Sequence, residues 1–101
     1  MRTIALWQCL DDLLDLYRKN PLLQENDSFV YDLPNGLYCL LCFYSFEDGV
    51  EQIRIRPMFS INGTHIPLEK DGLADGECGL ENEANFLVEA AWVIETKLLK
   101  A

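Results

Sequence analysis

The chain has 101 residues, of which half are hydrophobic and a quarter charged, and 17 acidic residues against 8 basic ones give it a net charge of −9 at pH 7. This length and apolar content predict one globular domain over residues 1–101 and exclude a disordered chain. The negative charge repels phosphate and anionic lipid, so we expect no direct contact with nucleic acid and no membrane binding. A protein partner with a basic surface fits this charge better.

An amphipathic helix is expected over residues 4–19, because apolar residues recur there at helical spacing. They are Leu6, Leu10, Leu13, Leu14 and Tyr17. Thr3 is the expected N-cap and Asn20-Pro21 the expected end, since a residue before proline avoids the helical region. Three aspartates lie off this stripe and break the apolar run that a signal peptide needs, which predicts a cytoplasmic protein. These are Asp11, Asp12 and Asp15.

Residues 29–66 follow the period of strands instead. Three turn signals divide them, at Leu33-Pro34-Asn35-Gly36, Glu47-Asp48-Gly49 and Asn62-Gly63. After the second turn the side chains alternate, with Ile53 and Ile55 on one face and Arg54 and Arg56 on the other. Pro57 is expected to interrupt the strand, as it would at an edge or bend. The segment predicts a four-stranded antiparallel meander.

The segment 67–83 is rich in glycine and acidic residues, and predicts a solvated loop. A final helix is expected over residues 81–100. Its apolar stripe consists of Ala84, Leu87, Ala91, Ile94 and Leu98, broadened by Val88, Trp92 and Leu99. Each helix has one apolar stripe and the strand 50–56 has one polar face, so both helices are expected on one face of the sheet. The predicted fold class is α+β, with a helix at each end of the meander.

Cys39 and Cys42 have the C-x-x-C spacing of metal and redox sites, but they lie in an apolar strand. Residues three apart on a strand point to opposite faces, so this pair is not expected to chelate an ion or form a disulfide. Cys9, Cys78 and His65 belong to a helix, a loop and a hairpin, and supply no second pair of ligands. We therefore expect free, buried cysteines and no metal site.

The sequence contains no catalytic or cofactor-binding motif, which predicts a protein that is not an enzyme and needs no cofactor. His65 is the only histidine, and no nucleophile pattern accompanies it. The region around Gly76 resembles a calcium loop only superficially, because Leu73 stands where the third ligand should be and Asn82 replaces the closing glutamate.

These observations favour a small acidic protein-binding domain. One hypothesis is an inhibitor or antagonist of a basic, nucleic-acid-handling protein in a bacterial or phage setting, of the immunity, anti-restriction or anti-CRISPR type. The alternative is a chaperone or adaptor that dimerises around a secreted or disordered client. The order of helix, strands and helix resembles small type III secretion chaperones, although residues 60–79 are too few for the further helix and strands of those proteins. The chain is expected to be a monomer or a homodimer, and its acidity is also open to a simpler interpretation as a solubility charge.

Two acidic regions are candidates for the partner-binding site. The first is the outer face of the N-terminal helix, with Asp11, Asp12 and Asp15. The second is the glycine-rich loop and the start of the last helix, with Glu69, Asp71, Asp75, Glu77, Glu81 and Glu83. Loops carry function more often than the scaffold that holds them, so the second region is the stronger candidate.

Overall fold

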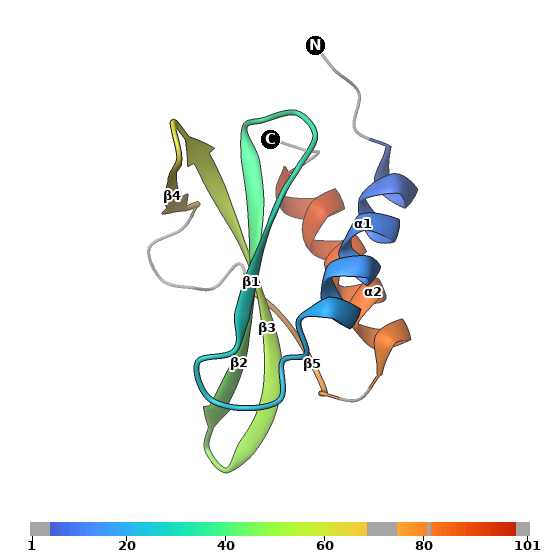
Figure 1. Ribbon diagram of the computed structural model, residues 1–101, viewed down its shortest axis with the longest axis vertical. Helices are drawn as coiled ribbons and strands as arrows, with labels where there is room; N and C mark the ends of the chain where they lie inside the picture. The colour runs from blue at the N-terminus through green and yellow to red at the C-terminus, as the bar shows by residue number, and fades with distance from the viewer. Residues whose placement is uncertain (1–4, 69–74, 81, 99–101) are drawn as a thin grey trace.

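The computed structural model describes residues 5–68, 75–80 and 82–98, and these form the predicted α+β fold (Figure 1). The helices come before and after the strands of an antiparallel sheet in the chain, and the elements run in this order: α1 (Leu6–Lys19), β1 (Ser28–Asp32), β2 (Tyr38–Glu47), β3 (Val50–Ile61), β4 (Thr64–Pro67), β5 (Gly76–Cys78), α2 (Glu83–Val93) and the π-helical turn η1 (Ile94–Leu98).

The sheet contains the predicted meander and one further strand. Strands β1, β2, β3 and β4 lie side by side in chain order, all antiparallel. Strand β5 then adds to β3, with Arg54 opposite Glu77. It lies within the segment expected to be a loop, so the prediction of an irregular connection over 67–83 is wrong for these three residues.

The predicted hairpin turns are confirmed. Asp48-Gly49 and Asn62-Gly63 each connect two strands directly, and all four residues have positive φ, between 50° and 79°. These angles define the type I′ turn, whose twist matches that of the strands. The first hairpin closes through a turn in which Gly36 N donates to Leu33 O at 3.1 Å.

Strand β3 runs through Pro57, so the expected interruption at this residue is wrong. The Pro57 carbonyl accepts a hydrogen bond from Leu68 N at 3.5 Å, which places its backbone polar groups on the β4 side of β3. On that side β4 pairs with residues 58–61 and β5 with residues 53–55. Pro57 therefore lies in the gap between two short strands. No neighbouring strand needs an N–H donor at this position, so the proline costs the sheet no hydrogen bond.

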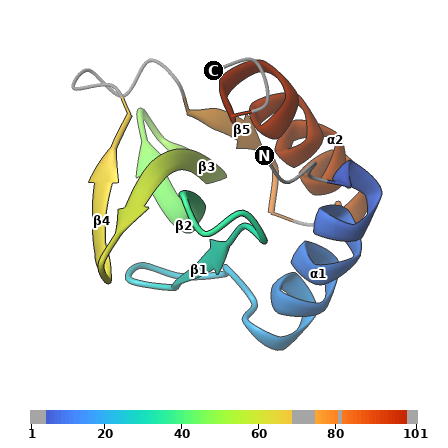
Figure 2. The same ribbon diagram turned by 90° about the horizontal axis from the view of Figure 1, so that it is seen from above.

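Both helices cover the same face of the sheet, as predicted (Figure 2). Their buried side chains meet those of the strands in one core, which includes Cys9, Leu13, Phe86, Ala90, Val93, Phe29, Leu40, Cys42, Ile53 and Ile55. Phe86 is fully buried, stacks on Tyr17 with a centroid separation of 4.5 Å and meets the edge of Phe29. Because strand residues alternate, Arg54 and Arg56 lie on the uncovered face.

Helix α1 begins at Leu6 with Ala5 at the N-cap, and no side chain caps it. Ala5 is extended rather than helical, and the expected start at Ile4 and the expected N-cap Thr3 lie outside the described residues. The predicted end is confirmed, since Asn20 donates from both its backbone N and its side-chain Nδ2 to Leu16 O. The outer face carries the three exposed aspartates, as expected.

Helix α2 presents a different face to the core from the one predicted. Asn82 caps it by accepting a hydrogen bond from Asn85 N at 3.1 Å. Ile94 and Leu98 are buried as expected, but Ala84, Val88 and Trp92 are exposed. The helix is apolar almost all the way round, so periodicity alone does not select its inner face, and the wider π-helical turn shifts the register of its last residues.

Candidate functional site

The outer face of α1 combines acidic side chains with one large exposed aromatic side chain. Asp11 and Asp15 are exposed, one and two turns after Trp7, and within the described part of the chain neither makes an ion pair. Asp12 is also exposed, and accepts a hydrogen bond from the Tyr31 hydroxyl at 3.2 Å. Trp7 exposes 70% of its surface. We call these four residues the α1 acidic surface.

Asp75, a predicted partner-binding residue, is instead held inside the fold. Only 3% of its side chain is exposed. Its carboxylate receives Arg56 Nε at 3.0 Å and Arg56 Nη2 at 2.9 Å in a bidentate pair, and Arg54 Nη1 lies 3.5 Å away. The side chain therefore ties the start of β5 to the uncovered face of β3, and has almost no surface left for another molecule.

Arg54 and Arg56 make further contacts on this face of the sheet. Arg54 Nη2 lies 3.0 Å from Glu47 and 3.2 Å from Glu77. The Arg56 guanidinium stands over the Phe43 ring, and its hydrogen bonds to Asp75 raise its pKa above the ordinary value. Arg54, Arg56 and their carboxylate partners form a connected group, which we call the β3 arginine cluster.

The other predicted acids of the second region have mixed positions. Glu77 is half-exposed in spite of its pair with Arg54. Glu83 forms a bidentate pair with Arg18 at 2.8 and 3.0 Å, which joins the end of α1 to the start of α2 and lowers the pKa of Glu83. Glu69, Asp71 and Glu81 lie outside the described residues. The structure therefore does not bring the second region together as one free acidic surface.

A shallow hollow of about 350 Å³ lies between β5 and α2. Glu77 and Glu89 contribute carboxylates to its lining, and Trp92 contributes an aromatic ring. The ammonium group of Lys97 stands 5.8 Å from the Trp92 ring centroid, in the range of a cation–π contact. Two groups of the hollow therefore already have partners in this chain: Lys97 contacts the Trp92 ring, and Arg54 pairs with Glu77.

The four cysteines are free thiols, and Cys39 and Cys42 point to opposite faces of the sheet. Cys42 lies in the core under the helices, where burial raises its pKa far above the ordinary value. Burial raises the pKa of Cys78 to about 11. The geometry excludes chelation of one ion by Cys39 and Cys42 as a pair, as predicted.

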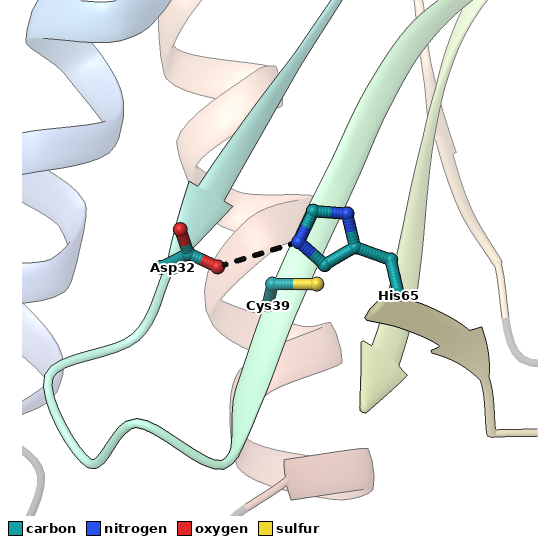
Figure 3. A group of neighbouring side chains, drawn as sticks. All are labelled: Asp32, Cys39 and His65. Atoms are coloured by element: carbon teal, nitrogen blue, oxygen red, sulfur yellow. Dashed lines mark ion pairs between the residues drawn. The ribbon is translucent and has the colours of Figure 1, made fainter. Parts of the chain in front are cut away.

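Cys39 lies beside two other side chains that suit a metal ion (Figure 3). Asp32 Oδ1 and His65 Nε2 are 3.8 Å apart, and one donor atom from each of the three residues lies within 4.8 Å of the others. Burial, with a smaller contribution from the Asp32 charge, raises the pKa of the Cys39 thiol. No local motif points to this cluster, because its members come from β1, β2 and β4.

In the part of the chain that the structure describes, no helix has both the length and the apolar character needed to cross a membrane. Comparison with protein-family models, with curated proteins and with solved structures finds no match for this chain.

Proposed function

We propose that this protein is a non-enzymatic protein-binding domain that engages a basic surface of its partner through the α1 acidic surface. The observation that carries the proposal is Trp7, which is largely exposed on the same helix face as Asp11 and Asp15. Tryptophan is enriched among the residues that supply most of the binding energy at interfaces. Carboxylates around it attract and orient a cationic partner before contact.

The α1 acidic surface fits this role better than the loop that the sequence favours. Asp75, Glu77 and Glu83 already face arginines of the same chain, so each would have to exchange an internal pair for an external one. Asp11 and Asp15 have no such pair among the described residues. A partner's lysine or arginine can therefore pair with them without breaking a salt bridge of the fold.

The partner we infer is a protein with a basic groove, of the kind that normally receives nucleic acid. Asp11 and Asp15 are four residues apart on one helix, so they present two negative charges about 6 Å apart along its axis, which suits the lysines and arginines of such a groove. An inhibitor or antagonist in a bacterial or phage setting, of the immunity, anti-restriction or anti-CRISPR type, matches this description.

The test is to capture the partner with the tagged protein, identify it, and measure association and dissociation at several salt concentrations. In Asp11→Asn/Asp15→Asn, we expect slower association and a flatter salt dependence with little change in melting temperature. In Trp7→Ala, we expect dissociation to be at least about tenfold faster, as for a central interface residue.

A matched control removes the same charge elsewhere. Glu25 and Asp48 are exposed and lie outside α1, so Glu25→Gln/Asp48→Asn should leave the association rate nearly unchanged. Equal effects of the two double substitutions would mean that only total charge matters, and would remove α1 from the interface. An unchanged dissociation rate in Trp7→Ala would mean that Trp7 does not lie in the interface.

The alternative, a dimeric chaperone or adaptor, is supported by a different observation. At the β3–β4 hairpin, apolar side chains on neighbouring strands remain exposed, namely Phe59, Ile61 and Ile66. Such a patch suits a second copy of the chain or an extended client. Sedimentation separates the two proposals, since an obligate dimer favours the chaperone and a monomer favours the inhibitor.

A further inference from the structure

We propose that Asp32, Cys39 and His65 form a binding site for a single zinc ion, or a similar divalent transition metal, on the face of the sheet opposite the helices (Figure 3). The site has three protein ligands and leaves the fourth tetrahedral position to water or another ligand. This proposal goes beyond the protein-binding role, and it reverses the expectation that the chain has no metal site.

Strand pairing in the sheet brings the three side chains together. Asp32 and Cys39 are directly opposite each other in the β1–β2 ladder. His65 is opposite Ser60 in the β3–β4 ladder, and the twisted sheet lets its imidazole reach across to Asp32. The β2–β3 ladder, with Cys39 opposite Met58, connects these two pairs. Three ladders therefore fix the three backbone positions, and little ordering remains to be done when an ion binds.

The distances are close to those of a tetrahedral site. Zinc bonds of about 2.0–2.3 Å imply separations of roughly 3.3–3.7 Å between ligand atoms. The Asp32–His65 separation is 3.8 Å, and all three donor atoms are within 4.8 Å of one another. Contraction by about 1 Å is within the reach of the side-chain rotations of Asp32 and His65, which are both exposed. Cys39 has no exposed surface and provides the fixed ligand.

The types of ligand indicate the class of metal. A thiolate and an imidazole suit zinc and other borderline or soft ions, whereas magnesium and calcium require oxygen ligands. Binding replaces the Cys39 S–H bond with an S–metal bond and releases the proton to solvent, so thiolate, carboxylate and Zn²⁺ together carry no net charge. Ser60 Oγ lies 3.4 Å from Asp32 Oδ1, where its hydroxyl supports the carboxylate that would hold the ion.

The competing explanation is an ion pair between Asp32 and His65 above a buried thiol, with no role for a metal. The two explanations differ in what Cys39 does. In the ion pair it is a small apolar filler, which serine of similar size replaces at a moderate loss of stability. In a metal site its sulfur is a ligand, and the same replacement removes metal binding.

The experiment titrates Co²⁺, and in a separate series Zn²⁺, into the reduced, chelator-treated protein at micromolar concentration. We expect one equivalent to bind, with a thiolate-to-cobalt charge-transfer band that Zn²⁺ displaces. Cys39→Ser should abolish the band, and His65→Gln should weaken binding at least tenfold. Cys78→Ser is the matched control, because Cys78 is a free thiol on β5 outside the cluster, and it should bind as the wild type does.

Circular dichroism of each variant shows whether it is folded. If Cys39→Ser does not fold, His65→Gln decides alone, since His65 is an exposed residue whose loss leaves the core intact. Binding of much less than one equivalent by the wild type would overturn the proposal. A charge-transfer band that persists in Cys39→Ser, or a metal affinity in His65→Gln equal to that of the wild type, would also overturn it.

Discussion

Replacing Asp75 by asparagine should be among the most damaging polar substitutions in this fold. The change keeps the size of the side chain but removes its charge, and it turns one oxygen that accepts hydrogen bonds from arginine into an NH₂ group. The Asp75 side chain is only 3% exposed and receives both arginines of the β3 arginine cluster. The substitution therefore leaves Arg54 and Arg56 without their shared counter-charge.

The expected loss follows from the exposure of each partner. Removing one member of a fully buried ion pair costs about 3–5 kcal/mol, because the remaining charge stays buried without compensation. Here the arginine side chains retain 19% and 32% exposure, and Arg54 keeps Glu47 and Glu77. Partial rehydration and these remaining pairs reduce the loss to about 2–3 kcal/mol. For a domain of this size that lowers the melting temperature by roughly 10–20 °C.

Urea unfolding followed by circular dichroism measures this loss directly, with the slope expected to stay constant. Glu77→Gln is the matched control, because it removes the same charge from a half-exposed partner of Arg54 and should cost less than about 1 kcal/mol. A loss in Asp75→Asn no larger than in the control would refute the conclusion that buried pairing at Asp75 holds β5 against the sheet.

Two further predictions concern β5 and the thiols. Gly76→Ala should destabilise the fold by about 1–3 kcal/mol in urea unfolding, because a Cβ there lies 2.8 Å from Val93 Cγ2 in the packed core, whereas Gly79→Ala has open space and should be nearly neutral. At pH 8, iodoacetamide should label Cys78 slowly, since a pKa of about 11 in place of 9.0 reduces its thiolate fraction about a hundredfold, and should reach Cys42 only on unfolding. Both raised pKa values also mean that the unfolded chain loses its thiol protons first, so the free energy of unfolding should fall as the pH rises above 9.0. Rapid labelling of both thiols in the folded protein, or stability that rises between pH 9 and 10, would contradict this.

The parts of the fold that the sequence predicts are those fixed by neighbouring residues. Asp48-Gly49 and Asn62-Gly63 accept positive φ, so they define type I′ turns wherever they stand between apolar arms. The alternation around Ile53 and Ile55 sets which face of β3 meets the helices. Each of these signals depends on a few consecutive residues, and tertiary structure does not override them.

Strand β5 depends instead on residues far apart in the chain. Its three residues, Gly-Glu-Cys, have low strand propensity and are typical of a loop. They pair with β3 because Gly76 permits close approach to Val93 and because Asp75 reaches the arginines of β3. Two favourable long-range contacts decide the conformation of a segment whose local preference is weak.

The proposed metal site shows the same limit for a candidate site. The expected absence of a metal site comes from considering cysteines two at a time and within single segments. Asp32, Cys39 and His65 are 7 and 26 residues apart along the chain, and only the β1–β2 register and the curl of the β3–β4 hairpin bring them together. The spacing of ligands along the sequence predicts a metal site when one loop supplies all the ligands. It does not predict a site whose ligands come from three separate strands.

The distribution of charge in the fold bears on whether a net charge of −9 is only a solubility device. A pure solubility charge needs no arrangement, and its cations would be scattered among its acids. Here Arg54 and Arg56 are gathered on the uncovered face of the sheet, where they neutralise acids of β2 and β5. Arg18 pairs with Glu83 at the far end of α1 from Trp7. Among the described residues, Asp11 and Asp15 in the middle of α1 form no salt bridge, and they lie next to a tryptophan whose burial in a complex would be favourable. A basic partner would meet that local excess of negative charge first, which is why we propose the interface on α1 rather than on the more acidic segment before α2.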